Sequence, residues 1–384
     1  MWLFRSGIVF LGYIVINIYT GIRFLSLIRY FFPTFSALVF WPLYILLSYS
    51  FVLGAISGLD EILPIRQVSM YCLPAFVYFF LALLVLDGLR AILNFFELIP
   101  PSRVLSAAGA GIALGITILL MLYGAFHARE IRTVYYDVTI NKNSEGAPVR
   151  LALVSDMHIG MSVGREWIAR IVDAVNAAEP DIICLAGDIF DNDLRIIRDL
   201  DGVEAELRRL NAPLGVFACQ GNHDIDRLSL RNAVTTDRIQ NFLEAAGITF
   251  LLDEVNLVAD RFYLAGRKDA RLIGLRQPRK SAGELVAGLD PAKPLIILNH
   301  QPTDFPAEEE AGADLILSGH THRGQFFPGN IATAIIFKRD GSVHYGHWKG
   351  KSIQAIITSG AGVWGPAIRI ATNSEVAVID ITFK

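Results

Sequence analysis

The stretch Leu151-Ala-Leu-Val-Ser-Asp156-Met-His158 decides the fold, because an apolar run stops there on an aspartate and a histidine. A short apolar run of this kind predicts a buried strand, and the two polar residues at its end predict metal ligands. The pattern returns four times, in residues 182–191, 216–224, 295–300 and 315–322. Because the carboxyl ends of parallel strands meet at one edge of a sheet, we expect five strand ends to deliver polar side chains to one place.

Charged residues are distributed unevenly along the 384-residue chain, whose mean hydropathy is +0.44. Residues 1–126 hold only 10 of the 71 charged side chains, and residues 127–384 hold the other 61. The net charge is +2 in the first part and −5 in the second, so the second part lacks the basic excess that nucleic-acid binding requires. The three cysteines give no disulfide framework.

Four charge-free windows lie in the first part, at residues 6–22, 35–59, 68–86 and 104–126. Each is near or above the roughly 17–25 residues that span a bilayer as a helix. We therefore predict four transmembrane helices. A cleaved signal peptide is the alternative for the first window, and buried core helices of a soluble domain are the alternative for all four. Because the windows contain no ionisable residue, an anchor or substrate platform is favoured over a transporter.

The arginines beside these windows do not decide the topology. Four lie on the side of the N-terminus and four on the opposite side, and they are Arg5, Arg66, Arg129 and Arg132 against Arg23, Arg29, Arg90 and Arg103. The sequence thus predicts a multi-pass membrane protein and leaves the side of the second part open, with the cytoplasm as the working expectation.

Residues 127–148 are predicted to be a linker with an edge strand at 134–140, and residues 149–384 to be one domain. Helical spacing of apolar residues predicts helices near 167–175, 200–210 and 239–246, with proline or glycine after each. Short β runs follow from 248 to 275, and we expect further strands at 335–337, 353–358 and 376–381. This order favours an α/β fold in which two sheets form a sandwich between helices, rather than one doubly wound sheet.

Histidines concentrate in the strand-end motifs. A single histidine is more often a structural residue than a ligand, but five of the eight histidines lie in these motifs: His158, His223, His300, His320 and His322. Carboxylate, imidazole and amide groups suit divalent metals, and a pair of metals requires one ligand that bridges both. The motifs therefore predict a dinuclear metal site.

These blocks, in this order, resemble the signature of the calcineurin-like metallophosphoesterases: Asp156-x-His158, Gly187-Asp188-x-x-Asp191, Gly221-Asn222-His223-Asp224, His300 and Gly319-His320-x-His322. The resemblance implies that Asp156, His158 and His322 hold one metal, that Asn222, His300 and His320 hold a second, and that Asp188 bridges them. It further implies that His223 is the catalytic acid and that Asp191 orients it. Asp224 stands where many members have glutamate, and we assign it only a supporting role.

The blocks 318–325 and 358–369 resemble the membrane-attached branch of that family, which includes a hydrolase of UDP-diacylglucosamine and the transmembrane metallophosphoesterases. Arg323 stands where glycine is usual, and both Arg323 and Arg369 are candidates to bind a substrate phosphate or, equally, to serve elsewhere. His344 and His347 match no ligand of the family and are expected at the surface of a hairpin. Asp191 replaces the tyrosine of the purple acid phosphatases, which argues against that neighbouring group.

The resemblance implies two divalent metal ions, with Mn²⁺ as the first expectation and Fe²⁺, Zn²⁺ or Mg²⁺ as alternatives. It also implies hydrolysis by an activated water, with His223 protonating the leaving oxygen. We expect a hydrolase of phosphoester or pyrophosphate bonds at a membrane, acting on a lipid-linked substrate such as a UDP-diacylglucosamine-like compound. The alternatives are a phosphodiesterase or phosphatase of soluble substrates with a plain anchor, and a non-catalytic scaffold. Neither nucleic acid nor a protein partner is expected.

Overall fold

The structure is a computed structural model of the whole chain. It describes every residue except 1, 51–62, 143, 145, 192–193, 225–235, 275–277 and 340. The chain divides into two compact units, Met1–Gly124 and Ala125–Lys384. We call them the helical unit and the two-sheet domain and describe each by itself.

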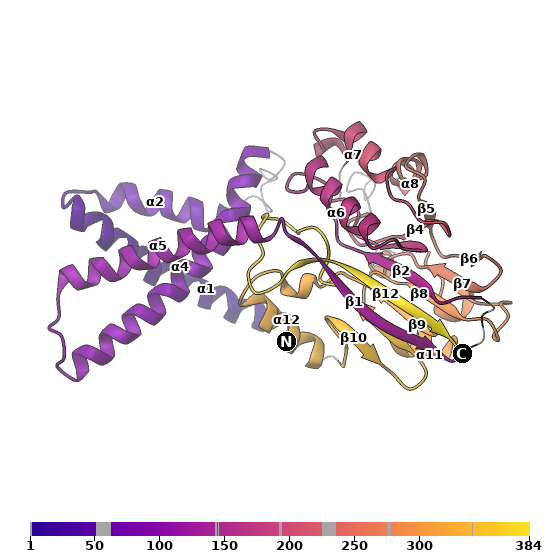
Figure 1. Ribbon diagram of the computed structural model, residues 1–384. Coiled ribbons are helices and arrows are strands. Elements are labelled where there is room, and N and C mark those ends of the chain that lie inside the picture. Colours follow the sequence, from indigo (N-terminus) through magenta and orange to yellow (C-terminus); the bar gives the residue numbers. More distant parts are fainter. Residues whose placement is uncertain are drawn as a thin grey trace. The chain divides into compact units, whose positions relative to one another are not determined.

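Four helices make up the described part of the helical unit: α1 (Trp2–Phe31), α2 (Ala37–Ser48), α4 (Leu63–Phe95) and α5 (Arg103–His127) (Figure 1). Leu27, Phe79 and Leu83 pack against alanines of α5, which include Ala107 and Ala110. Such small side chains let helix backbones approach closely, which is the usual way that helices associate in a membrane.

Three helices of the described part are long and apolar enough to cross a membrane, and not the four that we predicted. They are Leu11–Phe31, Gln67–Phe95 and Arg103–His127. The second predicted window, 35–59, differs because its described helix α2 has 12 residues. Such a helix is about 18 Å long, against a hydrocarbon core of about 30 Å. The rest of that window, from residue 51 onward, lies outside the described residues.

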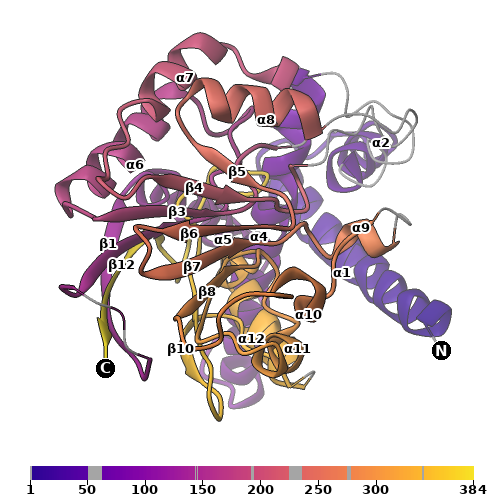
Figure 2. The ribbon, with the colours of Figure 1, turned by 90° about the vertical axis from the view of Figure 1, so that its right-hand side faces the viewer.

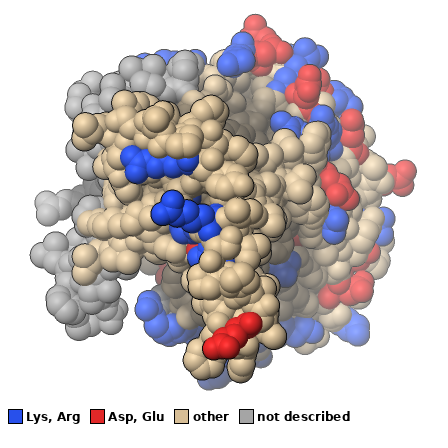
Figure 3. Space-filling model, turned by 90° about the vertical axis from the view of Figure 1, so that its left-hand side faces the viewer, with Lys and Arg blue, Asp and Glu red and all other residues tan. Residues whose placement is uncertain are grey.

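Large apolar side chains cover the surface of these helices. Leu38, Val85 and Leu119 are among the exposed ones, and Figure 3 shows broad areas of this surface without Lys, Arg, Asp or Glu. A surface of this kind is expected of helices that face lipid.

Five charged residues lie within the three candidate spans, whereas our charge-free windows contained none: Arg23, Arg29, Asp87, Arg90 and Arg103. The spans of the structure extend further than the charge-free windows and include Arg23 of α1 and Asp87 of α4, whose Nε and Oδ2 atoms are 2.7 Å apart. Tyr19 donates a hydrogen bond to Asp87, and Arg23 donates one to the carbonyl of Ser106 on α5. The two opposite charges thus satisfy each other and join three helices.

Two six-stranded sheets form the two-sheet domain. The first has the order β1-β12-β2-β3-β4-β5 and the second β10-β11-β9-β8-β7-β6. The strands are β1 (Ile131–Ile140), β2 (Val149–Val154), β3 (Ile182–Ala186), β4 (Val216–Cys219), β5 (Thr249–Leu251), β6 (Glu254–Val258), β7 (Phe262–Gly266), β8 (Leu295–Leu298), β9 (Leu315–Ser318), β10 (Gly346–Lys349), β11 (Gln354–Ile357) and β12 (Ser374–Phe383). The predicted two-sheet sandwich is confirmed.

The central strands are apolar throughout because both of their faces are covered. Leu151, Leu153 and Cys184 of the first sheet pack against Leu264 and Ile296 of the second. Outside the first sheet lie helices α6 (Arg165–Ala177), α7 (Leu200–Leu207) and α8 (Thr236–Ala245), and outside the second lie α10 (Ala282–Leu285) and α11 (Phe305–Glu310). Figure 2 shows this order of layers.

Two segments differ from the predicted strands. The edge strand β1 begins at Ile131, earlier than expected, and pairs in parallel with β12 over its whole length. Residues 335–337, which we predicted as a strand, lie instead in the helix α12 (Gly329–Arg339). A run of three apolar residues is compatible with either structure. In the structure, neither of the two sheets includes this segment.

Candidate metal centre

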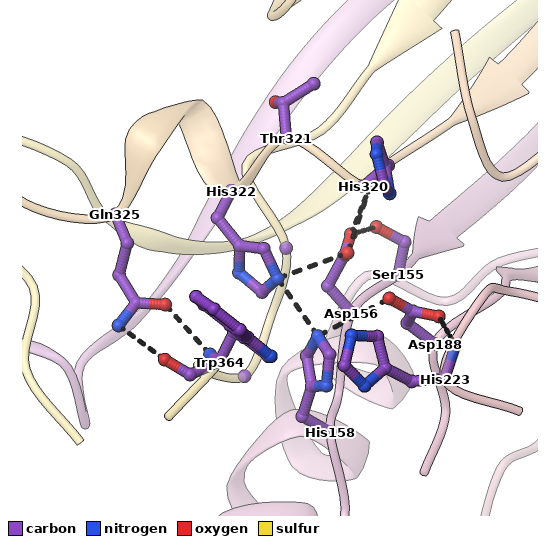
Figure 4. Close-up of polar contacts among 12 residues, drawn as sticks. Ser155, Asp156, His158, Asp188, His223, His320, Thr321, His322, Gln325 and Trp364 are labelled. Carbon is purple, nitrogen blue, oxygen red and sulfur yellow. Dashed lines mark hydrogen bonds and ion pairs between the residues drawn. The ribbon is translucent and has the colours of Figure 1, made fainter. Parts of the chain in front are cut away.

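All five predicted strand ends meet at one place. Asp156 and His158 follow β2, Asp188 and Asp191 follow β3, and Asn222 and His223 follow β4. His300 follows β8, and His320 and His322 follow β9. Because β2–β4 belong to the first sheet and β8–β9 to the second, the site lies where the two sheets come together. Figure 4 shows Asp156, His158, Asp188 and His322 pointing toward one another.

Two groups of three side chains have the geometry of metal sites. Asp156, His158 and His322 form the first, and Asp188, His300 and His320 form the second; within each group all ligand atoms lie within 4.8 Å of one another. Oδ2 of Asp188 is 3.1 Å from Nε2 of His300 and 3.6 Å from Nε2 of His158. This single carboxylate oxygen therefore faces both groups, as a bridging ligand must.

Unpaired buried atoms show that the residues fit a pair of cations. Oδ1 of Asn222 is buried and has no hydrogen-bond partner among the described residues, and Nε2 of His300, also buried, faces the carboxylate of Asp188. Nε2 of His158 and Nε2 of His322 face each other at 3.0 Å. Buried polar atoms without a partner are costly, and a divalent ion would satisfy imidazole nitrogen, carboxylate oxygen and amide oxygen together.

The electrostatics of most of these histidines favour metal binding. Burial lowers the pKa of His158 and of His320 to about 4, and it lowers the pKa of His322 well below its usual value. These imidazoles are thus neutral at pH 7, which is the state that binds a metal. Burial alone would raise the pKa of Asp188, but the neighbouring His300 and His158 hold it well below its usual range.

His300 should release a proton when the site is loaded with metal. Burial would lower its pKa, but the charge of Asp188 outweighs burial and raises it to about 10. At pH 7 the metal-free His300 therefore carries a proton that a cation must displace. We expect Mn²⁺ binding to release about one proton per chain from this group and to strengthen as pH rises toward 10.

Calorimetric titration with Mn²⁺ in buffers of different ionisation enthalpy measures this release. His347→Gln is the matched control. His347 lies on β10, its ring is hydrogen-bonded to Gln354, and it belongs to neither group of candidate metal ligands. A binding enthalpy that is independent of the buffer would contradict the assigned protonation of His300.

The backbone carries strain at the same residues. Asp156, His158, Asp188, His320 and His322 all have a positive φ, between 47° and 72°. Non-glycine residues adopt this region rarely, and each such residue costs about 1–3 kcal/mol. Strain of this kind concentrates at functional sites, so its position supports the assignment of the site.

Glycines let the ligand loops approach one another. A Cβ atom on Gly221 would overlap the backbone nitrogen of Asp188, and one on Gly319 would overlap the side chains of Ser155 and Asp156. These glycines of the sequence motifs are therefore required by close packing of the loops that carry the ligands.

His223 lies beside the two groups. Its Nδ1 is 3.5 Å from Oδ1 of Asp191, and its backbone nitrogen donates a hydrogen bond to Asp188 at 2.7 Å. Burial lowers the pKa of His223, but the hydrogen bond with Asp191 and the charge of Asp188 outweigh it and raise the pKa above its usual value. His158, Asp191 and His223 also have ligand atoms within 4.8 Å of one another, so a ligand role for His223 is the alternative to an acid role.

Asp224 connects two of the ligand loops. It is fully buried, and its carboxylate accepts hydrogen bonds from the backbone nitrogens of Phe190 and Gly221, both at 2.9 Å. Phe190 lies between Asp188 and Asp191, and Gly221 precedes Asn222. Asp224 thus holds these loops together through hydrogen bonds to their backbone. This is a supporting role of the kind that we expected for it.

Arg369, one of the two arginines considered for phosphate binding or for another role, lies inside the packed fold. It is fully buried, and its guanidinium donates hydrogen bonds to the carbonyls of Ser359, Gly360 and Gly362. Burial lowers its pKa to about 10. Nη1 also contacts the carbonyl of His322 at 3.4 Å, so Arg369 positions this candidate ligand.

Arg323, His344 and His347 lie outside the two groups. The guanidinium carbon of Arg323 is 4.1 Å from the ring centroid of Tyr345, a cation–π contact. The carbonyl of His344 accepts a hydrogen bond from Thr321, and His347 lies on the β10–β11 hairpin. Within the described residues, none of the three supplies an atom to a metal group.

Trp364 is a residue of the site to which the sequence analysis gave no role. Its ring is half exposed and lies 6.3 Å from the ring of His223. Gln325 holds its loop, because the Gln325 amide donates to the Trp364 carbonyl and accepts from the Trp364 backbone nitrogen, as Figure 4 shows. The only sequence signal was a tryptophan beside a glycine in the motif 358–369.

Known proteins resemble this chain in the same region. Residues 149–324 match the family model of the calcineurin-like phosphoesterases. An uncharacterized metallophosphoesterase of Aquifex aeolicus is 29% identical over 70% of this chain and 98% of its own length. One of Campylobacter jejuni is 25% identical over the full length of both. A zebrafish (Danio rerio) protein described as a transmembrane protein with metallophosphoesterase domain is 29% identical over 70% of this chain and 61% of its own length.

These relatives and the three apolar helices together indicate a membrane protein. Members of the matched family use a dinuclear site for divalent metals, and the two groups of ligands fit such a site. The chain carries a calcineurin-like metallophosphoesterase domain and is a metal-dependent phosphoesterase.

Proposed function

We propose that this protein is a multi-pass membrane hydrolase that cleaves a phosphoester or pyrophosphate bond of a lipid-linked substrate, such as a UDP-diacylglucosamine-like compound. One observation carries the hydrolytic part of the proposal. It is the pair of buried ligand groups that share the carboxylate of Asp188. A scaffold would have no use for two such groups, with their strained backbone and unpaired buried atoms.

Each residue then has a role. Asp156, His158 and His322 hold one ion, Asn222, His300 and His320 hold the second, and Asp188 bridges them. Two divalent ions, Mn²⁺ in our first assignment, would supply an activated water and positive charge against the phosphoryl oxygens.

His223 acts on the leaving group. Asp191 faces Nδ1 of the His223 ring, which assigns Nε2 to the leaving-group oxygen. The pKa of His223 is raised in the metal-free protein by its contact with Asp191 and by the charge of Asp188, which favours the protonated ring. His223 can therefore donate this proton as the phosphorus–oxygen bond breaks.

The helical unit supports a lipid-linked substrate. A single span is enough to anchor a protein, whereas the described part of this chain has three candidate spans. Additional helices would have a purpose if they held the acyl or prenyl chains of a substrate whose phosphate reaches the two-sheet domain. A soluble substrate with a plain anchor is the competing function, because the same three candidate spans would also serve as an anchor alone.

The test compares two proteins on two substrates with Mn²⁺ supplied. The full-length chain in detergent and a truncated chain of residues 130–384 are each assayed on a lipid-linked pyrophosphate and on a soluble chromogenic diester. Truncation should lower kcat/KM for the lipid substrate by about tenfold or more, because remote binding energy is lost, and should leave the diester unchanged. If the two proteins have equal kcat/KM values on each substrate, the helices serve only as an anchor.

A further inference from the structure

Helix α12 exposes an apolar surface on the two-sheet domain. Ile331, Ile335 and Ile336 are 49%, 62% and 48% exposed, and Phe327, just before the helix, is 39% exposed. None of the residues of α12 is buried. We call these four side chains the α12 surface.

This surface is unusual within its domain. In the described part of residues 125–384, eight large hydrophobic side chains are exposed, and four of them belong to the α12 surface. Apolar side chains scattered singly on a surface need no explanation, but a contiguous group of them marks a site of interaction. Because no residue of α12 is buried, these apolar side chains are not part of the hydrophobic core of the domain.

The charges at the end of the helix indicate the partner. Lys338 and Arg339 lie in the last turn of α12 and are exposed, and α12 contains no acidic residue. Apolar side chains followed by cationic ones match the acyl boundary and the anionic headgroups of a bilayer. A bilayer is also the partner that this chain always has nearby, because α5, a candidate span, ends at His127, four residues before β1 begins.

The helix is directly connected to the metal centre. It follows the short 3₁₀ helix η3 (His322–Gly324), which carries the candidate ligand His322. Gly324 and Gly329 approach so closely that a Cβ on either would overlap the other's backbone. The backbone of Phe327 also donates a hydrogen bond to the carbonyl of Ile370 at 3.0 Å, one residue after Arg369. Whatever holds α12 therefore also holds the loops around His322.

We propose that α12 is a membrane-docking helix, whose α12 surface enters the bilayer interface beside the metal centre. Docking would bring the metal centre to the level of the lipid headgroups, so that a phosphate in a headgroup reaches it without leaving the membrane. The docking stands on the exposed surface alone, and only this consequence for substrate access rests on the proposed function.

The docking is tested by fluorescence quenching in the full-length chain reconstituted in nanodiscs of phosphatidylcholine and phosphatidylglycerol. Cys72→Ser removes the half-buried thiol, while Cys184 and Cys219 are buried. A fluorophore is then attached through Ile335→Cys or, as a matched control, through Leu257→Cys on β6, where the side chain is 38% exposed. Doxyl-labelled lipids should quench the label at position 335 and not the label at 257.

Two results would overturn the docking. The first is equal quenching of both labels by aqueous iodide with none by doxyl lipid. The second is a label at 335 that is shielded from both quenchers, which would mean that protein, either the helical unit or a second copy of the chain, covers α12.

A second measurement connects the docking to substrate access. The double variant Ile331→Ser, Ile335→Ser replaces exposed side chains only, and it should lower kcat/KM for a lipid-linked phosphodiester in nanodiscs on the order of tenfold. The rate on a soluble diester and the metal content should not change. An equal fall on both substrates would overturn the inference about access. If the wild-type chain hydrolyses neither substrate while position 335 is still quenched by lipid, the proposed function fails and the docking stands.

Discussion

The variant His223→Gln is expected to lower kcat by about 10²–10⁴-fold, the usual contribution of general acid catalysis. Both metal ions should remain, because His223 belongs neither to the group of Asp156, His158 and His322 nor to the group of Asp188, His300 and His320. Glutamine keeps the size and polarity of the side chain but cannot donate a proton to a leaving alkoxide. Steady-state kinetics together with metal analysis of the purified variant measures both effects.

The dependence on the leaving group distinguishes an acid from a structural residue. A nitrophenolate leaves without help, whereas an alkoxide requires a proton, so the defect should be much smaller for a nitrophenyl ester than for an alkyl ester. His347→Gln, on β10 and outside the site, is the matched control and should retain full activity. If metal content falls together with activity, His223 is instead a ligand with His158 and Asp191, which the distances also permit.

The variant Asp188→Asn is expected to abolish dinuclear binding. Asp188 is buried, and its Oδ2 lies near His158 of one group and His300 of the other. Asparagine removes the negative charge that two cations would share. Loss of groups that only support a ligand already weakens metal binding about 10- to 100-fold, and loss of the bridge should exceed that.

Metal analysis should show the stoichiometry falling from about two ions per chain in the wild type, with activity lost in parallel. The variant should also abolish the proton release from His300, because the charge of Asp188 is what raises the pKa of His300. Asp380→Asn is the control, since Asp380 is a carboxylate of β12 that pairs with Arg150. A variant that is fully active with one ion per chain would rule out the bridging role.

The residues of the candidate site that the structure brings together, and the elements that carry them, could be predicted from the sequence. Fully apolar runs of four to six residues, each ending on Asp, Asn or His, are local patterns that identify buried strands without any knowledge of their partners. Parallel strands direct their carboxyl ends to one sheet edge, so the convergence of Asp156, Asp188 and His320 also followed. The helical spacing of Trp167, Ile171 and Val175 identified α6 in the same way.

Other features were decided by the tertiary structure, because they depend on partners far away in the chain. A short apolar run near residue 335 is compatible with a strand or a helix, and local pattern does not say which. The parallel pairing of β1 with β12 joins segments more than 230 residues apart, and no local pattern encodes a partner at that distance. Arg369 was a candidate for substrate binding by residue type, but its burial against four carbonyls is a property of the packed fold.

The sequence by itself therefore determined which side chains the strand ends carry to the candidate site, in which order, and that apolar helices accompany them. The tertiary structure alone decided that one oxygen of Asp188 faces a histidine from each of the two groups of candidate metal ligands. It also decided that α12 exposes its isoleucines. The physical reason is that residue type and periodicity are local properties. Distance, burial and exposure, in contrast, arise only when both sheets and their helices pack together.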